Sequence, residues 1–426
     1  MLIQFSVENY RSIRDKQTLS LAASKYFKEL DVNGFAVGVS EQVPRLLRSS
    51  VLYGPNASGK STLINAVDFM REQVIHSAKE SQANEEIDVV PFKLSASSRA
   101  QDSEFEVAFV EAGVRYQYGF RCNRTRFTEE WLFAYPHGRT QKWFHRVFDA
   151  KTKKDKYRFS THFAGGKKRL DWADQTRPNA LFLSTALQLN CEQLIPVLDW
   201  FQRRLRVIKA HQFQELGVTM RKCRDTDDKQ RVLDFMNSAG LSMTDIRIVT
   251  QAFSAEMLPN SLSASLRDEL TQRMAGKELM HAKFLHQELD TAKPVELDRD
   301  EESDGTIALF GFAGHWLDAI DEQRVLIVDE LDSSLHPLIV HHLVKLLHQD
   351  NRQAQLVFTT HDTTLLSQKI LRRDQVWFME KDMNNATQLY PLSDYSPRDN
   401  EALERGYLNG RYGGIPFLKD LDFYGQ

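Results

Sequence analysis

A glycine-rich turn between an apolar run and a helix-like segment constrains this chain more than any other feature. The turn reads Gly-Pro-Asn-Ala-Ser-Gly-Lys-Ser over residues 54–61 and matches the pattern G-x-x-x-x-G-K-[ST]. SVLY before it is β-prone, and STLINAVDFM after it has apolar residues at helical spacing. A chance glycine turn would match this pattern on the order of one time in a hundred. The turn and its context therefore predict a phosphate-binding loop, here called the P-loop.

The chemistry of the P-loop predicts a nucleotide with Mg²⁺. Inward-facing backbone N–H groups and the following helix N-terminus attract phosphate groups. Lys60 can reach the β- and γ-phosphates, and the Ser61 hydroxyl can ligate Mg²⁺. Because the loop reads phosphates and not the base, ATP is expected but GTP is left open. The residues expected to contact the nucleotide are Gly54, Pro55, Asn56, Ala57, Ser58, Gly59, Lys60, Ser61 and Thr62.

Two further apolar runs end in polar residues that suit hydrolysis. RVLIVDELDSSLHP contains four apolar residues, 325–328, that read as a buried parallel strand ending at Asp329 and Glu330. We expect Asp329 to hold Mg²⁺ through water and Glu330 to orient or deprotonate the attacking water. QLVFTTHD is the next β-prone run, and it ends at His361. This histidine is either an ordinary loop residue or, as we expect from its place, a sensor of the γ-phosphate.

A helix start precedes the Asp-Glu strand. Ser303-Asp304-Gly305-Thr306 opens a segment with helical apolar spacing, so a hydroxyl and backbone N–H groups are expected at a helix N-terminus. Since the chain already has a P-loop, we expect Ser303 and Gly305 to cap the γ-phosphate held by a second subunit. The alternative is a plain N-cap, which is common.

Taken together, these motifs resemble the ABC-type ATPase heads of SMC, RecF and OLD proteins, over residues 1 to about 416. ENYRSI, at 8–13, is similar to the N-terminal strand of those heads, where the arginine that matches Arg11 approaches the phosphates. The family's glutamine that links its lobe to Mg²⁺ has no counterpart near Pro91, and Gln73 and Gln82 are possible substitutes that we leave unassigned. His336 stands where transporter-type heads have an interface aspartate.

Shorter strings resemble the stand-alone ATPases of bacterial abortive-infection systems, AbiL-like and RloA-like, with the ATPase of PARIS phage defence as a relative. These strings are PFKL, RPNALFLSTA, EESDGT, LRRDQVWFMEKD and GYLNGRYGGIP. The resemblance implies a role in antiphage defence. It also implies a separate effector protein, such as an RloB-like or Toprim-type nuclease.

The expected fold is α/β: a P-loop ABC-type ATPase head with an antiparallel β lobe, an inserted helical subdomain and no long coiled coil. We divide the chain into 1–185, the N-terminal half of the head with P-loop and lobe; 186–276, a helical insertion; and 277–426, the C-terminal half. EFEVAFV, VRYQYGFRC and TEEWLFAY alternate as antiparallel strands do, whereas KTKKDKYRFS reads as a loop. The sequence has no heptad array for a long coiled coil, and the chain after His361 is too short for a nuclease domain.

Composition excludes few partners. Net charge is −3, so binding to nucleic acid is permitted but not indicated. The basic patches could face nucleic acid or a protein partner, although such patches are more often solvated helix faces; they are Arg203, Arg204, Arg206, Arg221 and Lys222. The three cysteines lack C-x-x-C pairing, which is typical of a reducing interior, and no apolar segment is long enough for a membrane. We therefore expect a cytoplasmic protein without a membrane partner. The histidines at 341, 342 and 348 are expected to be surface and packing residues and not metal ligands.

The mechanism that these expectations favour is ATP-gated association into a homodimer or a higher homo-oligomer. Two alternatives from other classes stay open. One is a RecF-like protein of DNA repair or replication that binds DNA in an ATP-dependent way. The other is a scaffold that binds nucleotide without turning it over, against which Glu330 and His361 argue.

Overall fold

The computed structural model describes residues 1–38, 43–258, 262–291, 293–350, 352–367, 369–395 and 402–416. The chain divides into two compact units. The head unit comprises Met1–Lys209, Ala319–Asp332 and Val340–Gln426, and the inserted unit comprises Ala210–Asp318 and Ser333–Ile339. The division expected from the sequence, at 185 and 276, followed the order of the motifs and stays a prediction. Residues 417–426 of its third part lie outside the described residues.

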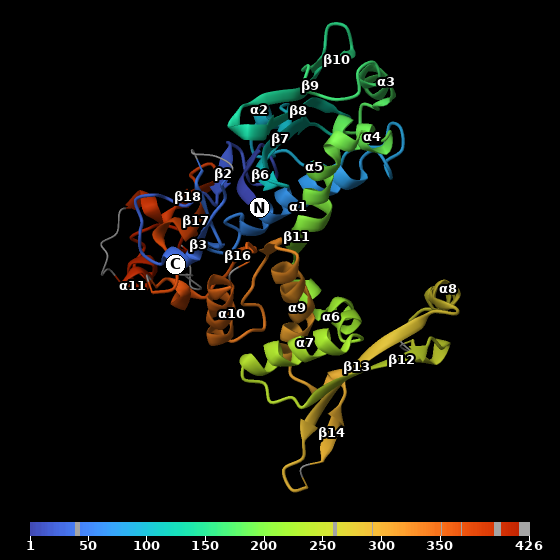
Figure 1. Cartoon of the computed structure of the whole chain (residues 1–426), viewed down its shortest axis with the longest axis vertical. Coiled ribbons are helices and arrows are strands. Elements are labelled where there is room, and N and C mark those ends of the chain that lie inside the picture. Colours follow the sequence, from blue (N-terminus) through green and yellow to red (C-terminus); the bar gives the residue numbers. More distant parts are fainter. Residues whose placement is uncertain are drawn as a thin grey trace, which may run out of the picture. The chain divides into compact units, whose positions relative to one another are not determined.

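A mostly parallel sheet forms one layer of the head unit (Figure 1). In spatial order its strands are β11 (Leu205–Ile208), β15 (Val325–Val328), β16 (Gln355–Thr359), β5 (Ser49–Tyr53), β17 (Val376–Lys381) and β18 (Thr387–Pro391). All pairs are parallel except β17 with β18. β5, β15 and β16 are buried along their whole length, as expected for strands covered on both faces. Their carboxyl ends therefore meet at one edge of the sheet.

Two amphipathic helices adjoin this sheet. α1 (Lys60–His76) begins directly after the P-loop and buries one side of the helix, including Leu63, Val67, Met70 and Val74. α10 (Pro337–Gln349) runs from the inserted unit into the head unit, and His348 near its end contacts Ser49 of β5, with 2.8 Å between Nε2 and Oγ. The strand–turn–helix context predicted for the P-loop is confirmed.

An antiparallel sheet forms the lobe of the head unit. Its strands, in spatial order, are β10 (Lys154–Phe159), β9 (Gln141–Asp149), β8 (Phe127–Tyr135), β7 (Val114–Cys122), β6 (Ser103–Glu111), β1 (Leu2–Glu8) and β2 (Gln17–Ser20). The expected antiparallel lobe is thus confirmed. Trp131, Trp143 and Phe144 are buried in it and form part of its core.

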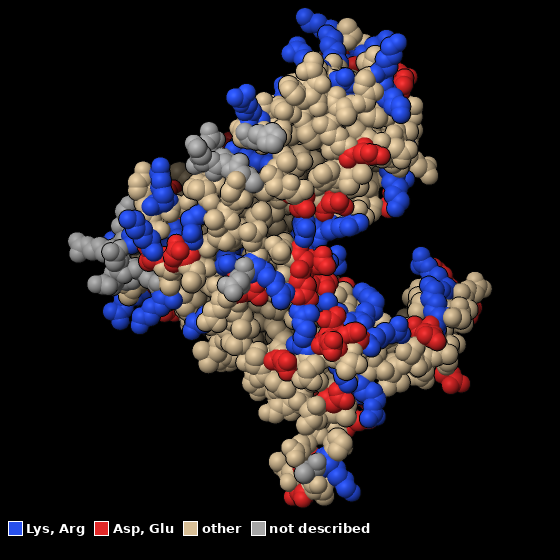
Figure 2. All heavy atoms as spheres, in the orientation of Figure 1, with Lys and Arg blue, Asp and Glu red and all other residues tan. Residues whose placement is uncertain are grey.

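The prediction of a loop at KTKKDKYRFS was wrong, because residues 154–159 form the edge strand β10. The lysines make this segment polar overall, so its alternation of polar and aromatic residues was not recognised as a strand pattern. Tyr157 and Phe159 alternate with cations and pack on Phe182, with ring centroids 5.3 and 5.5 Å away. Figure 2 shows Lys and Arg side chains gathered over β10 and α3.

Buried charges join this lobe to the end of α1. Arg146 is fully buried and donates to Ala180 O at 2.7 Å and to Asp155 at 2.8 Å. The Glu130 carboxylate accepts the N–H groups of Phe182 and Leu183 at 2.6 and 2.9 Å. Close by in the chain, Arg177 donates to Ala78 O and Asn179 to Gln82 O, both just beyond α1. The RPNALF segment therefore holds the lobe against the helix that starts at the P-loop.

Short elements complete the head unit. They are α2 (Ala96–Arg99), α3 (Lys168–Gln175), α4 (Phe182–Gln188), α5 (Ile195–Asp199), α11 (Leu403–Leu408) and the hairpin of β3 (Gly34–Ala36) with β4 (Arg45–Leu47).

The inserted unit combines helices with a small sheet. Its elements are α6 (Gly217–Lys222), α7 (Thr226–Ser238), β12 (Asp245–Ala252), α8 (Ala264–Met274), β13 (Glu278–Gln287), β14 (Pro294–Leu297) and most of α9 (Asp304–Asp321). α9 is bound to α6 through Thr219, whose hydroxyl donates to Phe310 O at 2.7 Å. The range 186–276, expected to be a helical insertion, contains the strands β11 and β12 as well as helices. No helix among the described residues is long and apolar enough to cross a membrane.

Candidate nucleotide-binding site

The P-loop follows the carboxyl end of β5, and two of its glycines are needed for steric reasons. A Cβ on Gly54 would collide with the carbonyl oxygen of Met379 on the neighbouring strand β17. Gly59 has φ +114°, which side chains disfavour, and a Cβ there would collide with Thr387. The loop is therefore packed tightly on β17 and on the start of β18.

The side chain of Lys60 folds back onto the P-loop. Its Nζ donates to Gly54 O at 2.6 Å and to Pro55 O at 3.3 Å. Burial lowers the pKa of Lys60, and the negative charges of Asp329, Glu330 and Asp332 act in the opposite direction. The ammonium group thus occupies the place from which a P-loop lysine reaches phosphate oxygens.

Thr359, at the end of β16, connects the two acidic residues that follow β15. Its hydroxyl donates to Asp329 Oδ1 at 2.8 Å and accepts the N–H of Glu330 at 2.7 Å. Glu330 adopts φ +55°, in the left-handed region, and its side chain is exposed. Backbone strain of this kind is frequent at active sites. The sequence analysis gave Thr359 no role.

A cavity of about 440 Å³ brings most of the predicted P-loop residues together with Glu330 and His361, whereas Gly54 and Asp329 do not line it. It is lined by Ser12, Pro55, Asn56, Ala57, Ser58, Gly59, Lys60, Ser61, Thr62, Glu330 and His361. Asp332 fixes the backbone of His361, whose N–H donates to Asp332 Oδ2 at 3.1 Å. The other oxygen of Asp332 and the hydroxyl of Ser58 are buried without a hydrogen-bond partner among the described residues. Unpaired buried polar atoms beside the P-loop fit a site that is completed by a polar ligand.

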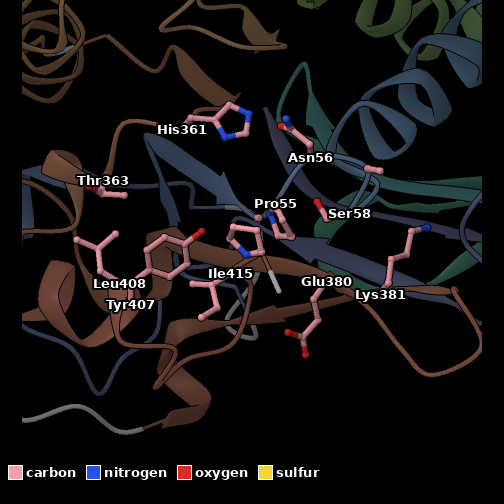
Figure 3. Close-up of a pocket in the computed structure, with 13 residues that line it drawn as sticks. Pro55, Asn56, Ser58, His361, Thr363, Glu380, Lys381, Tyr407, Leu408 and Ile415 are labelled. Carbon is pink, nitrogen blue, oxygen red and sulfur yellow. The ribbon is translucent and has the colours of Figure 1, made fainter. Parts of the chain in front are cut away.

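A second cavity of about 860 Å³ also borders the P-loop and shares Pro55, Asn56, Ala57, Ser58 and His361 with the first (Figure 3). Pro55, Tyr407 and Ile415 converge in the view, with Glu380 and Lys381 to one side and His361 to the other. Hydrogen bonds fix the segment after 402 to the rest of the head: Thr363 Oγ1 donates to Glu404 at 2.9 Å, Gly414 N to Glu380 at 2.9 Å, and the Tyr390 hydroxyl to Tyr412 O at 3.1 Å. Sequence reasoning assigned none of the residues from 380 onward to the site, because only the fold brings them to the P-loop.

Side-chain hydroxyl groups form hydrogen bonds with the P-loop and with the first turn of α1. Thr387 Oγ1 donates to Ser58 O at 2.8 Å and accepts from Lys381 Nζ at 2.9 Å. Ser12 Oγ lies 2.9 Å from Thr387 Oγ1 and donates to Thr62 Oγ1 at 3.1 Å. The Thr62 hydroxyl, expected to contact nucleotide, therefore accepts a hydrogen bond from Ser12 in the turn between β1 and β2, although Thr62 also lines the cavity.

Arg11 and the candidate glutamines lie apart from the P-loop cavities. Arg11 is exposed, its N–H donates to Val90 O at 2.7 Å, and its guanidinium lies 5.4 Å from the ring centroid of Tyr10. Its neighbour Ser12 lines the smaller cavity, whereas Arg11, Gln73 and Gln82 line neither cavity. A contact of Arg11 with phosphate stays a prediction.

Ser303 and Gly305 lie in the inserted unit, at the start of α9. The Ser303 hydroxyl accepts the N–H of Thr306 at 3.1 Å, so it acts as the N-cap of the helix. Gly305 leaves little room for a side chain, since a Cβ would meet Ser334 O at 3.0 Å. Their expected role toward a second subunit stays a prediction.

The donor set fits a nucleotide with Mg²⁺. Ser61 and Asp329 offer hydroxyl and carboxylate oxygens, the hard ligands that Mg²⁺ prefers together with phosphate oxygens and water. Lys60 and the backbone N–H groups of the P-loop suit the phosphates. A bound Mg²⁺ would supply positive charge to the phosphate oxygens.

A family comparison supports this geometry. Residues 49–180 and 194–367 match a family described as "AAA domain, putative AbiEii toxin, Type IV TA system". The match covers more than half of the chain. The chain belongs to this family. The AAA-domain match includes the P-loop, α9, the Asp-Glu strand and His361, and it leaves out Arg11 and the segment after 367.

Two of the solved structures to which this chain is similar are SMC heads. The SMC head domain from Thermotoga maritima has 13% identity and a TM-score of 0.39, covering 92% of this chain and 98% of that chain. An SMC head bound to the C-winged helix domain of ScpA has 11% identity and a TM-score of 0.39, covering 92% and 97%. No curated protein matches this AAA domain.

Proposed function

We propose that this AAA domain binds and hydrolyses ATP with Mg²⁺, and that two heads associate face to face when ATP is bound. The observation that supports hydrolysis most directly is the pair of hydrogen bonds by which the Thr359 hydroxyl joins Asp329 to Glu330, here called the Thr359 bridge. It orders Asp329 and the backbone of Glu330 through a single hydroxyl, and Glu330 lines the same cavity as Lys60. Ordered carboxylates beside a P-loop are the arrangement that P-loop enzymes use to hold Mg²⁺ and position water.

Each residue has a distinct part in the proposed reaction. Lys60 and the P-loop backbone hold the phosphates, and Ser61 and Asp329 hold Mg²⁺. Glu330 orients the water that attacks the γ-phosphate, and His361, fixed through its N–H by Asp332, contacts the γ-phosphate edge. Ser303 and Gly305 of a second subunit close the site. Since both γ-phosphates then hold the two heads together, hydrolysis releases them.

The proposed biological role is control of a separate effector, such as an RloB-like or Toprim-type nuclease, in bacterial abortive-infection defence against phage. Two observations support this role. The family description names a putative AbiEii toxin and a type IV toxin–antitoxin system. The short strings from PFKL to GYLNGRYGGIP resemble AbiL-like, RloA-like and PARIS ATPases. A cytoplasmic location follows from this role.

Mixing two inactive variants tests the composite site. Lys60→Ala removes the lysine of a head's own site, and Ser303→Asp puts a negative charge next to the partner's γ-phosphate while keeping an N-cap for α9. Each variant alone should lose ATPase activity. In an equal mixture half of the dimers are mixed, and each mixed dimer of two-fold symmetry contains one intact site of two, so about a quarter of the wild-type rate per chain should return.

The matched control is a mixture of Lys60→Ala with Glu330→Gln. Both changes affect the nucleotide of the same head, so no mixed dimer has an intact site and the rate should stay low. Recovery in the control, or no recovery in the test mixture, contradicts the composite site. A Ser303→Asp protein that hydrolyses ATP at the wild-type rate contradicts it as well.

A further inference from the structure

The outer edge of the lobe carries a concentration of positive charge that the proposed ATPase does not use. Between 151 and 169 the chain has eight Lys and Arg residues and one carboxylate, whereas the whole chain has a net charge of −3. We call these eight residues the basic tip. They are Lys151, Lys153, Lys154, Lys156, Arg158, Lys167, Lys168 and Arg169. Figure 2 shows blue side chains gathered over β10 and α3, where these residues lie.

The strand β10 sets three of the cations in a row. Lys154, Lys156 and Arg158 are exposed and share one face of the edge strand. Successive members are about 7 Å apart, because an antiparallel strand rises about 3.4 Å per residue. The other face is turned to the core: Asp155 pairs with Arg126 and Arg146 at 2.7 and 2.8 Å. The single carboxylate of the segment is thus neutralised on the inner side.

Most cations of the basic tip are not neutralised by the chain itself. Within the described residues, Lys156 pairs with Asp149 at 2.5 Å, and Arg169 donates to the carbonyl oxygens of Ser160 and Gly166. Lys151, Lys153, Lys154, Arg158, Lys167 and Lys168 have no ion pair among the described residues.

Protection of a sheet edge explains only part of this charge. Lysines on edge strands prevent sheets from joining edge to edge, which accounts for cations on β10. Lys167 and Lys168, however, stand at the N-terminus of α3, where the helix dipole disfavours positive charge. Charges that oppose local stability are expected where a surface binds something.

We propose that the basic tip binds the phosphate backbone of duplex DNA, independently of base sequence. Phosphate contacts from unpaired lysines and arginines supply most of such binding. Single strands are less suited, because they bind by stacking on aromatic side chains and Tyr157 and Phe159 pack on Phe182. A membrane surface is also less suited, since Leu170, at 66% exposure, is the one exposed large apolar side chain among residues 151–170. This function goes beyond the proposed ATPase and effector control.

The test is fluorescence anisotropy of a labelled 30-base-pair DNA duplex at 50–200 mM salt, without nucleotide. The variant combines Lys154→Glu, Arg158→Glu and Lys168→Glu. The control reverses three exposed lysines of the head elsewhere, Lys25→Glu, Lys28→Glu and Lys93→Glu, so that net charge changes equally. We expect at least tenfold weaker binding at 100 mM salt for the tip variant and a change of less than twofold for the control.

A variant that combines Lys154→Gln, Arg158→Gln and Lys168→Gln gives a second readout. Each lost phosphate contact should reduce the slope of log affinity against log salt by about one, so the triple glutamine variant should lose about three. Unchanged ATPase activity in both tip variants shows that they fold. Equal weakening by tip and control variants, or no binding of duplex by the wild type at 50 mM salt, overturns the proposal. Binding to anionic vesicles or to a second copy of the chain in place of DNA overturns it too.

Discussion

At the scale of single residues, Thr359 shows why the site is only partly visible in the sequence. The residues of the P-loop were predictable, because the pattern 54–61 is continuous and each position has a fixed chemical task. Thr359 and Asp329 are 30 positions apart and meet only because β15 and β16 pair in register. Lys381 and Thr387 face each other across β17 and β18, and Thr387 N donates to Ser12 O at 2.8 Å, so these three residues also meet only in the folded chain.

The Thr359 bridge leads to a prediction for catalysis. Thr359→Val keeps the shape of the side chain and removes the hydroxyl that binds Asp329 Oδ1 and the N–H of Glu330. ATP affinity should change by less than about threefold, whereas the hydrolysis rate should fall by about 10–100-fold, the usual effect of losing a group that orients a metal ligand.

The measurements are equilibrium binding of a fluorescent ATP analogue and steady-state phosphate release. Thr359→Ser is the control, because it restores the hydroxyl and should recover most of the rate. A valine variant that hydrolyses ATP as fast as the wild type would show that the Thr359 hydroxyl is not needed for hydrolysis.

At the scale of elements, the prediction succeeded where one face of a strand or helix is plainly apolar. α1 and the strands β6 to β8 followed from hydrophobic periodicity, and β5 and β15, which are buried on both faces, followed from short apolar runs. β10 was missed because its three cations, two lysines and one arginine, outnumber its two inward aromatic residues. β12 was missed because it pairs with β13 in a small sheet whose exposed residues leave almost no apolar alternation.

The packing of α10 on β5 predicts a pH dependence of stability. Burial lowers the pKa of His348 to about 3, and Arg48 acts in the same direction. The unfolded chain has the ordinary value near 6.5 and so binds more protons between pH 6.5 and 3. The stabilisation is therefore present above pH 6.5 and is lost as the pH falls, by about 1.4 kcal/mol at pH 5.5.

Thermal unfolding of the wild type and of His348→Gln between pH 5 and 8 measures this effect. The variant should be the less stable protein at pH 8, since it loses the contact with Ser49. The gap in Tm should narrow as the pH falls, because glutamine does not titrate. Parallel curves for the two proteins would show that His348 does not titrate in this way.

At the scale of the whole molecule, the central claim concerns two copies of the chain. The P-loop, Asp329, Glu330 and His361 belong to the head unit, whereas Ser303 and Gly305 belong to the inserted unit. In the proposed dimer, each nucleotide is held by the head unit of one copy and by the start of α9 of the other. Nucleotide binding should then control association, and Glu330 should control release.

The most direct test is the solution mass of the wild type and of Glu330→Gln, measured by light scattering with and without ATP and Mg²⁺. Without nucleotide, both proteins should have the monomer mass of 49.2 kDa. With ATP and Mg²⁺, the variant should accumulate a dimer or a higher assembly, and the wild type should return to monomer as ATP is consumed. A mass that never changes with nucleotide in either protein would contradict the ATP-gated dimer.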